Sequence, residues 1–237
     1  MVHGYNMRNK ERRCIALLVK YPEAGKVKTR LAAHYGDELV AKLYGCFIED
    51  LLDMLRKGTY DVRITFTPRE KESSIIERFG TSGSYVPQRG ADLGVRMRNA
   101  FADCFAEGFS SCIVIGSDCP DLTDSIMEEA FRALEKGSDA VIGPAFDGGY
   151  YLIGFRKETF RPEAFYGVAW GSDRVMEQTV RCLERERCTI RILLPWQDVD
   201  RPEDMRELIK RNKTTGFAHS KTMAYLVHCG VPDDERK

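Results

Sequence analysis

The sequence lacks the features that mark several large classes of protein. It has no run of about 18 apolar residues, so we expect no membrane-spanning helix. The first 13 residues, MVHGYNMRNKERR, contain no apolar core, so we expect no secretory signal peptide. The 237 residues carry no net charge, because 36 Lys and Arg balance 36 Asp and Glu. That balance argues against a nucleic-acid partner held by bulk charge.

Cysteine is present eight times, but the spacing typical of metal sites is missing. No Cys-x-x-Cys pair occurs, and the four histidines do not complete a zinc-binding pattern. Most of the cysteines fall inside apolar runs, where a free thiol behaves as a small hydrophobic side chain. We therefore expect a reduced, cytoplasmic protein that does not bind membranes.

Short apolar runs alternate with helical patterns along the chain, and the hydrophobic fraction of 43% is typical of a globular protein. The predicted strands are 14–19, 60–67, 84–88, 112–117, 139–145, 150–155 and 189–195. The predicted helices are 28–56 with an interruption at 36–37, 68–79, 93–109, 123–136, 172–187 and 202–210. This alternation predicts an α/β fold of three layers, with helices on both faces of a mainly parallel sheet.

A single domain is expected over about residues 10–211. The remaining stretch, 212–237, gives the weakest pattern; 222–228 can form one or two helical turns, and the end is expected to fray. In open α/β sheets, ligands bind beyond the carboxyl ends of the strands, so candidate functional residues are sought just after each strand.

The loop after the first strand is rich in cations. Lys20, Lys26, Lys28 and Arg30 fall within eleven residues, and Gly25 allows a ligand to approach the backbone. Cations beside the start of a helix are typical of a phosphate site. The loop matches neither the P-loop nor the dinucleotide-binding pattern, and the alternative is a solvated basic loop.

Two aspartates follow the most apolar strand. Asp118 and Asp121 lie in the segment GSDCPD, and carboxylates at a strand end suit a hard divalent cation. Asp118 is expected to point into the crevice, as a metal ligand and catalytic residue. Asp121 either does the same or caps the following turn.

The segment Asp147-Gly148-Gly149 separates two predicted strands. It is either a simple hairpin turn or part of a substrate site, because paired glycines let a ligand come close to the backbone. Asp147 is a candidate acceptor-binding group or general base, with Gly148 and Gly149 beside it.

The segment that closes the last strand carries Asp198 and Asp200. In an extended chain the two carboxylates point to one side, so one of them can reach a second metal position, which we assign to Asp200. The alternative for either residue is a helix cap ahead of Pro202.

Two further segments precede predicted helices. Gln88 and Gly94 belong to QRGADLG and are candidates for contact with a base or a phosphate. Trp170 belongs to WGSD and is a candidate for the acceptor side of the site. The alternative for this second segment is a helix start with Ser172 as its cap.

Six motifs together resemble the DUF2064 family, over about residues 13–210. They are KYPEAGKVKTRLA (20–32), QRGADLGVRM (88–97), IGSDCPDLT (115–123), DAVIGPAFDGGYYLIG (139–154), AWGSDRVMEQT (169–179) and DVDRPEDM (198–205). The family is described as glycosyltransferase-like, with the nucleotide-diphospho-sugar transferase (GT-A, Rossmann-like) fold. It is also called the transferase associated with radical-SAM and selenodomain proteins. The sequence is also distantly similar to 2-phospholactate and molybdenum-cofactor guanylyltransferases.

The resemblance implies that the first-strand loop holds nucleotide phosphates. It also implies that Asp118, in a Gly-x-Asp-x-Pro motif, holds Mg²⁺ or Mn²⁺. Glycosyltransferases usually carry Asp-x-Asp there, whereas this chain has Asp118-Cys119-Pro120. The guanylyltransferases often have a glycine-rich first loop, and this one is lysine-rich.

The hypothesis is a metal-dependent transferase that acts on a nucleotide-activated substrate. Glycosyl transfer from a nucleotide-diphospho-sugar to an unidentified acceptor is the first choice, with Lys20, Lys28 and Arg30 stabilising the departing diphosphate. Nucleotidyl transfer with release of pyrophosphate is the alternative, and a non-catalytic nucleotide-binding module is the third. An exposed sheet edge would allow a homodimer, although no dimer is visible in the sequence.

Overall fold

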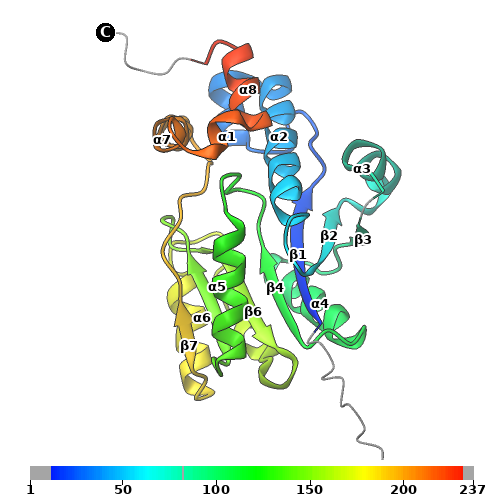
Figure 1. The fold of residues 1–237 in the computed structure, drawn as a ribbon, viewed down its shortest axis with the longest axis vertical. Coiled ribbons are helices and arrows are strands. Elements are labelled where there is room, and N and C mark those ends of the chain that lie inside the picture. Colours follow the sequence, from blue (N-terminus) through cyan, green and yellow to red (C-terminus); the bar gives the residue numbers. More distant parts are fainter. Residues whose placement is uncertain (1–11, 82, 232–237) are drawn as a thin grey trace, which may run out of the picture.

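The computed structural model describes residues 12–81 and 83–231 (Figure 1). The stretch considered for a signal peptide falls almost wholly in residues 1–11, and the last part of the predicted extension falls in 232–237, so both lie outside the described residues. None of the described helices is long and apolar enough to cross a membrane.

Seven strands form one sheet in the order β3-β2-β1-β4-β6-β5-β7. Their bounds are β1 Arg13–Lys20, β2 Asp61–Thr67, β3 Ser84–Pro87, β4 Ser111–Ile115, β5 Ala140–Pro144, β6 Tyr150–Arg156 and β7 Ile190–Ile192. Only β6 runs antiparallel to its neighbours β4 and β5; the other pairs are parallel. Each predicted strand is present, and the mainly parallel sheet is confirmed.

Eight α-helices and four short 3₁₀ turns connect the strands in the described residues. The helices are α1 Thr29–Tyr35, α2 Asp37–Leu55, α3 Glu72–Phe79, α4 Leu93–Ala106, α5 Asp124–Glu135, α6 Val175–Arg185, α7 Pro202–Asn212 and α8 Lys221–His228. The 3₁₀ turns are η1 Arg69–Lys71, η2 Lys157–Thr159, η3 Pro162–Phe165 and η4 Gly216–His219. The predicted break at Gly36 falls between α1 and α2.

The sheet is buried on both faces, which accounts for the unbroken apolar run of β1. Ile15, Leu17 and Val19 pack into one core with α1, α2, α3, α5, α7 and α8, while the intervening residues of β1 pack into a second core with α4, α6 and η3. Figure 1 shows α2 and α5 crossing the near face of the sheet. The three layers therefore follow from side chains that alternate between two cores.

Several predicted elements begin or end a few residues away from the observed ones, and two of these differences have a visible cause. The strand predicted over 189–195 stops at Ile192, because the chain then leaves the sheet and runs along the end of β5. The helix predicted from 172 begins at Val175, and Ser172 is not its cap. Instead, the Ser172 hydroxyl accepts a hydrogen bond from the Arg174 amide and donates one to the Ala169 carbonyl, which builds a turn ahead of the helix.

The segment after α7 is anchored on α2. The amides of Lys221 and Thr222, at the start of α8, donate to the Asp50 carboxylate at 2.9 and 2.8 Å. Met223 and Leu226 are buried in the core that α2 shares. Figure 1 shows α1, α7 and α8 gathered at the end of the sheet toward which β1 runs, so these helices flank the carboxyl ends of the strands.

Candidate functional site

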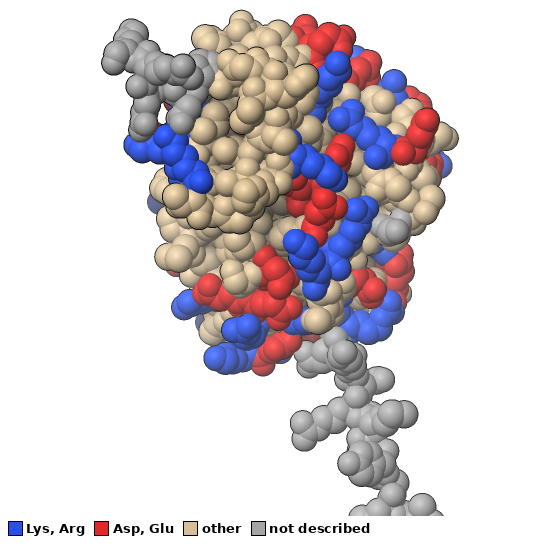
Figure 2. Space-filling model, turned by 45° about the horizontal axis from the view of Figure 1, so that its top comes forward, with Lys and Arg blue, Asp and Glu red and all other residues tan. Residues whose placement is uncertain are grey.

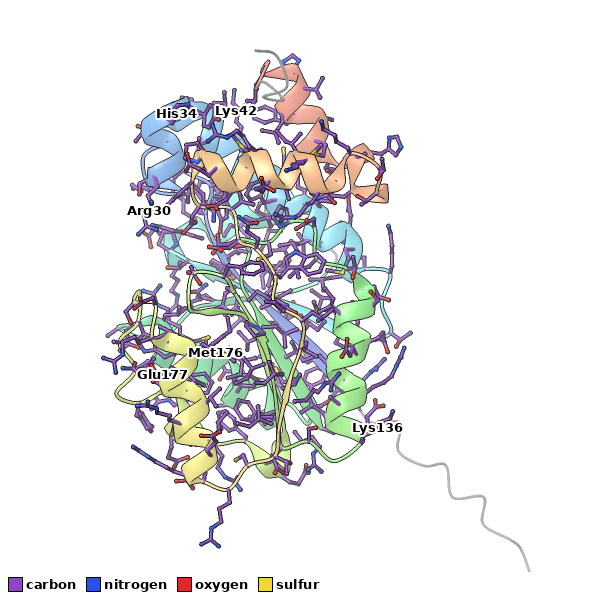
Figure 3. All side chains as sticks on the ribbon, turned by 90° about the vertical axis from the view of Figure 1, so that its left-hand side faces the viewer. Arg30, His34, Lys42, Lys136, Met176 and Glu177 are labelled. Atoms are coloured by element: carbon purple, nitrogen blue, oxygen red, sulfur yellow. The ribbon has the colours of Figure 1, made fainter. Side chains whose placement is uncertain are left out.

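A cleft of about 860 Å³ opens at the carboxyl ends of the parallel strands. Residues just after β1, β3, β4 and β5 line it, as do the start of the antiparallel β6 and the segment that follows β7. Of the candidates from the sequence, Lys20, Arg30, Gln88, Asp118, Asp147, Gly149, Trp170, Asp198 and Asp200 line the cleft. Figure 3 places Arg30, near the start of α1, above the first turn of α6 with Met176 and Glu177.

The Lys28 ammonium joins two carboxylates from distant parts of the chain. Lys28 Nζ forms an ion pair with Asp118 Oδ1 and donates a hydrogen bond to Asp200 Oδ1 at 2.7 Å. The Lys28 side chain is only 4% exposed, and it lines a second cavity of about 490 Å³ beside the cleft. Arg30 Nη1 lies 3.7 Å from the other oxygen of Asp200. Lys28 thereby contacts two carboxylates that lie 90 and 172 residues later in the sequence.

The first-strand loop holds Lys28 in this position through its backbone. Lys28 has φ 46° and ψ 46°, the left-handed conformation that few non-glycine residues adopt, and it stands at the N-cap of α1. The preceding Val27 is buried and fixes the loop to the core. Lys20 Nζ donates to the Lys26 carbonyl at 2.5 Å, while the Lys26 side chain pairs with Glu23. Gly25 turns with φ 73° and lies outside the lining of the cleft.

The segment after β7 brings Asp200 to the same place. The Trp196 amide donates to the Pro144 carbonyl, and the Val199 amide donates to the Asp118 carbonyl, both at 2.9 Å. The cap alternative for Asp200 is wrong, because Arg201 is the N-cap of α7. The Asp204 carboxylate accepts from the amides of Asp200 and Arg201, which leaves the Asp200 carboxylate for Lys28.

The charged groups in the cleft shift one another's pKa values. Burial disfavours the charged form of Lys28, but Asp118 and Asp200 outweigh it and hold the Lys28 pKa above its ordinary value. Burial also opposes ionisation of Asp200, yet Lys28 and Arg30 keep the Asp200 pKa below its usual range. Burial raises the pKa of Asp198 to about 6, and the neighbouring charges of Asp147 and Asp200 act in the same direction. The site is therefore strongly charged although the chain is neutral.

Sequence reasoning missed the side chains behind Asp118. The Tyr44 hydroxyl on α2 shares a hydrogen bond of 2.6 Å with Ser117 Oγ and accepts one from the Lys20 amide at 3.2 Å. Burial raises the Tyr44 pKa to about 12, and the Asp118 charge contributes. This contact ties the ends of β1 and β4 together. Arg96 on α4 also lines the cleft and lies inside a quoted motif, whereas no local pattern marks Tyr44.

Asp121 does not enter the cleft. Its buried carboxylate accepts hydrogen bonds from Arg211 Nε at 2.7 Å, Arg211 Nη2 at 3.0 Å, Asn212 Nδ2 at 2.7 Å and Trp196 Nε1 at 2.9 Å. These partners lie on α7 and on the segment after β7. Asp121 therefore fixes α7 against the β4 loop, and neither the metal role nor the turn cap considered for it is present.

The Asp147-Gly148-Gly149 turn forms part of the cleft wall. The Gly149 amide donates to Asp147 Oδ1 at 2.8 Å, which orients the exposed carboxylate. Gly148 has φ 88°, and a Cβ added there would come within 2.1 Å of the Asp173 carbonyl oxygen. Gly148 is therefore required by the packing of the turn against the segment before α6, and it does not line the cleft itself.

Gln88 and Gly94 also have structural contacts that the sequence did not predict. Gln88 Nε2 donates to the carbonyls of Val19 and Thr65, at 3.1 and 2.8 Å, so its amide group bridges the ends of β1 and β2. A Cβ added at Gly94 would meet the Trp170 indole at 2.5 Å. Gly94 thus makes room for Trp170, whose ring packs edge to face with Tyr150 at 6.4 Å between centroids.

The acidic residues of the cleft fit a divalent cation that is completed by a ligand. Mg²⁺ is commonly held by one or two carboxylates, with substrate phosphates and water supplying the other oxygens. Asp118 and Asp200 supply two carboxylates, and their side chains are half and about one-third exposed. The Lys28 ammonium between them shows that the space between the two carboxylates suits a cation. Within the described residues, no three carboxylates of the cleft bring one oxygen each to within 4.8 Å of one another. These residues therefore do not form a complete cage by themselves.

Figure 2 shows Lys and Arg interspersed with Asp and Glu over the right and lower parts of the visible face, without a broad field of one sign. The charges of the cleft are therefore a local arrangement, consistent with a small charged ligand.

The chain is similar to a known structure over most of its length. The family model "Uncharacterized protein conserved in bacteria (DUF2064)" matches residues 51–172. The structure of a proposed nucleotide-diphospho-sugar transferase from Desulfovibrio desulfuricans G20 is 39% identical; it covers 92% of this chain and 95% of that one, with a TM-score of 0.89. No curated protein matches the chain.

Two distant structures share the fold. Rv0371c from Mycobacterium tuberculosis H37Rv, solved with manganese, is 12% identical with a TM-score of 0.53, over 84% of this chain and 98% of that one. CMP:2-keto-3-deoxy-manno-octonic acid synthetase, solved with CTP, is 10% identical with a TM-score of 0.50, over the same shares. Together with the closer structure, they confirm the predicted fold class.

Proposed function

Because the chain belongs to the DUF2064 family, we propose that it is a metal-dependent transferase acting on a nucleotide-activated substrate. The reaction proposed first is glycosyl transfer from a nucleotide-diphospho-sugar. Its support is the 39% identical structure of a proposed nucleotide-diphospho-sugar transferase, together with the charged cleft at the carboxyl ends of the strands.

One observation carries the proposal, namely the Lys28 ammonium between the carboxylates of Asp118 and Asp200. A nucleoside diphosphate is an anion that needs both a cationic side chain and a divalent ion, and this arrangement offers a lysine beside two carboxylates. Lys20 and Arg30 line the same cleft and add positive charge at its rim. The proposed metal ligands are Asp118 and Asp200, with Mg²⁺ or Mn²⁺ as the ion.

The bound metal would neutralise charge that develops on the departing phosphate. Lys28, Lys20 and Arg30 would bind the same phosphates. Asp147 lines the cleft with an exposed carboxylate, so we assign it to the acceptor, as a group that orients or deprotonates its hydroxyl.

Aromatic side chains near Asp147 also suit this part of the cleft to the acceptor. Trp170, Tyr150 and Phe146 line this part of the cleft, and Phe146 is 67% exposed. Aromatic faces beside a carboxylate bind the carbon skeleton of a hydroxyl compound and leave its polar groups directed at Asp147. Gly149 keeps the backbone of the turn close to this space.

Nucleotidyl transfer is the second candidate, and the segment after β4 favours it. This segment supplies one carboxylate to the cleft, Asp118, because Pro120 stands where glycosyltransferases usually carry a second aspartate and Asp121 turns inward to α7. In this reaction the same cations would hold a nucleoside triphosphate. The two reactions differ in product, since one releases a nucleoside diphosphate and the other releases pyrophosphate.

A binding experiment tests the shared part of both candidates. The melting temperature is measured with UDP-, GDP- and CDP-sugars and with the four nucleoside triphosphates, each with Mn²⁺ and with EDTA. We expect one nucleotide class to raise the melting temperature when Mn²⁺ is present, because a ligand that binds only the native state stabilises it. Released nucleoside diphosphate and pyrophosphate are then measured for the nucleotide that binds.

Asp118→Asn is the matched variant, and Asp61→Asn is its control at the opposite end of the sheet, where the carboxylate is exposed. The Mn²⁺-dependent part of the shift should disappear in Asp118→Asn and persist in Asp61→Asn. If no nucleotide stabilises the wild-type protein in either condition, the transferase proposal is wrong. If Asp118→Asn keeps the full Mn²⁺ effect, the metal assignment is wrong.

A further inference from the structure

Three buried cysteines converge on the face of the sheet that α4 covers. Cys14 on β1 and Cys112 on β4 are direct partners in the parallel register, and Cys104 reaches them from α4. The three sulfur atoms lie within 4.8 Å of one another, and the sulfurs of Cys104 and Cys14 are 3.6 Å apart. Each of the three residues is at most 1% exposed.

A buried cation faces this group. Arg63 on β2 pairs in register with Ala16, two residues after Cys14, so its side chain lies on the same face of the sheet. Arg63 is 2% exposed, and its charge acts on all three thiols. One nitrogen, Nη2, pairs with Glu107, while Nε and Nη1 have no hydrogen-bond partner within residues 12–81 and 83–231.

An arginine with two nitrogens that lack hydrogen-bond partners is costly to bury, because a desolvated cation needs anionic or polar partners. Three neutral thiols are poor acceptors and leave that need unmet. Thiolates would satisfy it, but several thiolates repel one another unless a cation lies between them. The arrangement of Arg63 beside the cysteines therefore suits thiolates that are held together by a metal ion.

We propose that Cys14, Cys104 and Cys112 form a binding site for a single soft metal ion, Cu(I), with Arg63 offsetting the negative charge of the thiolates. Thiolate ligands select soft ions such as Cu(I). Metal–sulfur bonds of about 2.3 Å place three sulfurs about 4 Å apart around a trigonal ion. The three sulfurs here all lie within 4.8 Å of one another, with those of Cys104 and Cys14 at 3.6 Å.

Zn²⁺ fits this group less well. Structural zinc sites are nearly always tetrahedral with four ligands, and no fourth histidine, cysteine or carboxylate joins the three cysteines in the described part of the chain. Water cannot readily supply the fourth ligand, because the group is closed to solvent. Coordination by three thiolates, without a fourth ligand, suits Cu(I).

The site is separate from the cleft. Cys14 is near the beginning of β1 and Lys20 is at its end, and six residues of extended strand span about 20 Å. The ion would therefore stabilise the packing of α4 against the sheet and would take no part in the proposed transfer. This inference does not rest on the proposed function.

The test is an anaerobic titration of the fully reduced, full-length protein with Cu(I) in competition with the chelator bicinchoninate. Because the site is closed, the titration is done on the native protein and on protein refolded from urea with Cu(I) present. We expect one Cu(I) per chain to be retained against the chelator, and X-ray absorption of the loaded protein to show three sulfur neighbours. A parallel titration with Zn²⁺ should show weaker binding to this group.

Cys104→Ala and Cys112→Ala should each lower the Cu(I) affinity at least tenfold. The control is the double variant Cys182→Ala/Cys229→Ala, which removes two partly exposed thiols and should bind as the wild type does. Wild-type protein that loses all Cu(I) to the chelator, or that shows fewer than three sulfur neighbours, overturns the proposal without reference to any variant. Unchanged binding by a folded Cys104→Ala protein, or tighter binding of Zn²⁺ than of Cu(I), also overturns it.

Discussion

Replacement of Asp121 by alanine should destabilise the protein through one buried carboxylate. The Asp121 side chain is 3% exposed and accepts four hydrogen bonds, two of them from the Arg211 guanidinium. The alanine variant leaves Arg211, the nearly buried Asn212 and the Trp196 indole N–H without this acceptor. The lost hydrogen bonds connect the loop after β4 with α7 and with the segment after β7.

The size of the effect follows from the burial of the partners. Removing one partner of a fully buried ion pair costs about 3–5 kcal/mol, because the other charge is left unpaired. The Arg211 side chain is 27% exposed and can regain some contact with water, whereas Asn212 cannot. We therefore expect a loss near the lower limit, about 3 kcal/mol in the free energy of unfolding.

The assay is equilibrium unfolding in urea at pH 7, with tryptophan fluorescence as the signal and the midpoint and slope fitted together. Asp61→Ala is the matched control, because Asp61 and its partner Arg12 are exposed and 3.6 Å apart. The control should lose less than about 0.5 kcal/mol. Arg211→Met and the double variant complete a cycle that isolates the coupling between Asp121 and Arg211.

A loss below about 1 kcal/mol in Asp121→Ala would refute the reasoning, since it would mean that water replaces the lost acceptor. Additive effects of Asp121→Ala and Arg211→Met would also refute it, because direct partners should couple. Because the Arg211 guanidinium also donates to the Gln197 carbonyl, we further expect the variant to weaken the Mn²⁺-dependent nucleotide shift.

Three other variants test the cleft. Gly94→Ala should displace the Trp170 indole and reduce the nucleotide-dependent rise in melting temperature, whereas Gly216→Ala, where a methyl group meets nothing within 4 Å, should behave as the wild type. Gly148→Ala should lower the unfolding free energy by about 2–3 kcal/mol in urea, because it combines a positive φ with a backbone clash; an unchanged midpoint would contradict the clash. Lys28→Met should melt at a lower temperature than the wild type in EDTA, because Asp118 and Asp200 then repel each other. Mn²⁺ should raise the melting temperature of this variant more than that of the wild type. Equal melting temperatures in EDTA would contradict the ion-pair role of Lys28.

The fold was largely predictable from the sequence. The interiors of β1, β4, β5 and β6 are apolar because the sheet is covered on both faces, and helical spacing separates the strands, so local patterns determine which elements form. The position of the site was predictable for a related reason, because the ends of parallel strands meet at one edge. Asp118, Asp147 and Arg30 all line the cleft there.

The role of individual residues in that region was not predictable. Asp118 and Asp121 are three residues apart in one loop, yet only Asp118 faces the cleft, because Asp121 turns inward to α7. Gln88 and Gly94 came from a suggestive motif, but their contacts with β1, β2 and Trp170 depend on elements that are remote in the sequence. A local pattern gives the chemical type of a side chain and not its direction.

The sequence by itself determined the α/β architecture and the edge of the sheet at which charged residues collect. Only the tertiary structure decided that Lys28 bridges Asp118 and Asp200, and that Cys14, Cys104 and Cys112 meet beside Arg63. The physical reason is that hydrophobic periodicity acts over a few residues. Pairing of buried charges and thiols, in contrast, depends on strand order and on where each connecting segment returns to the sheet.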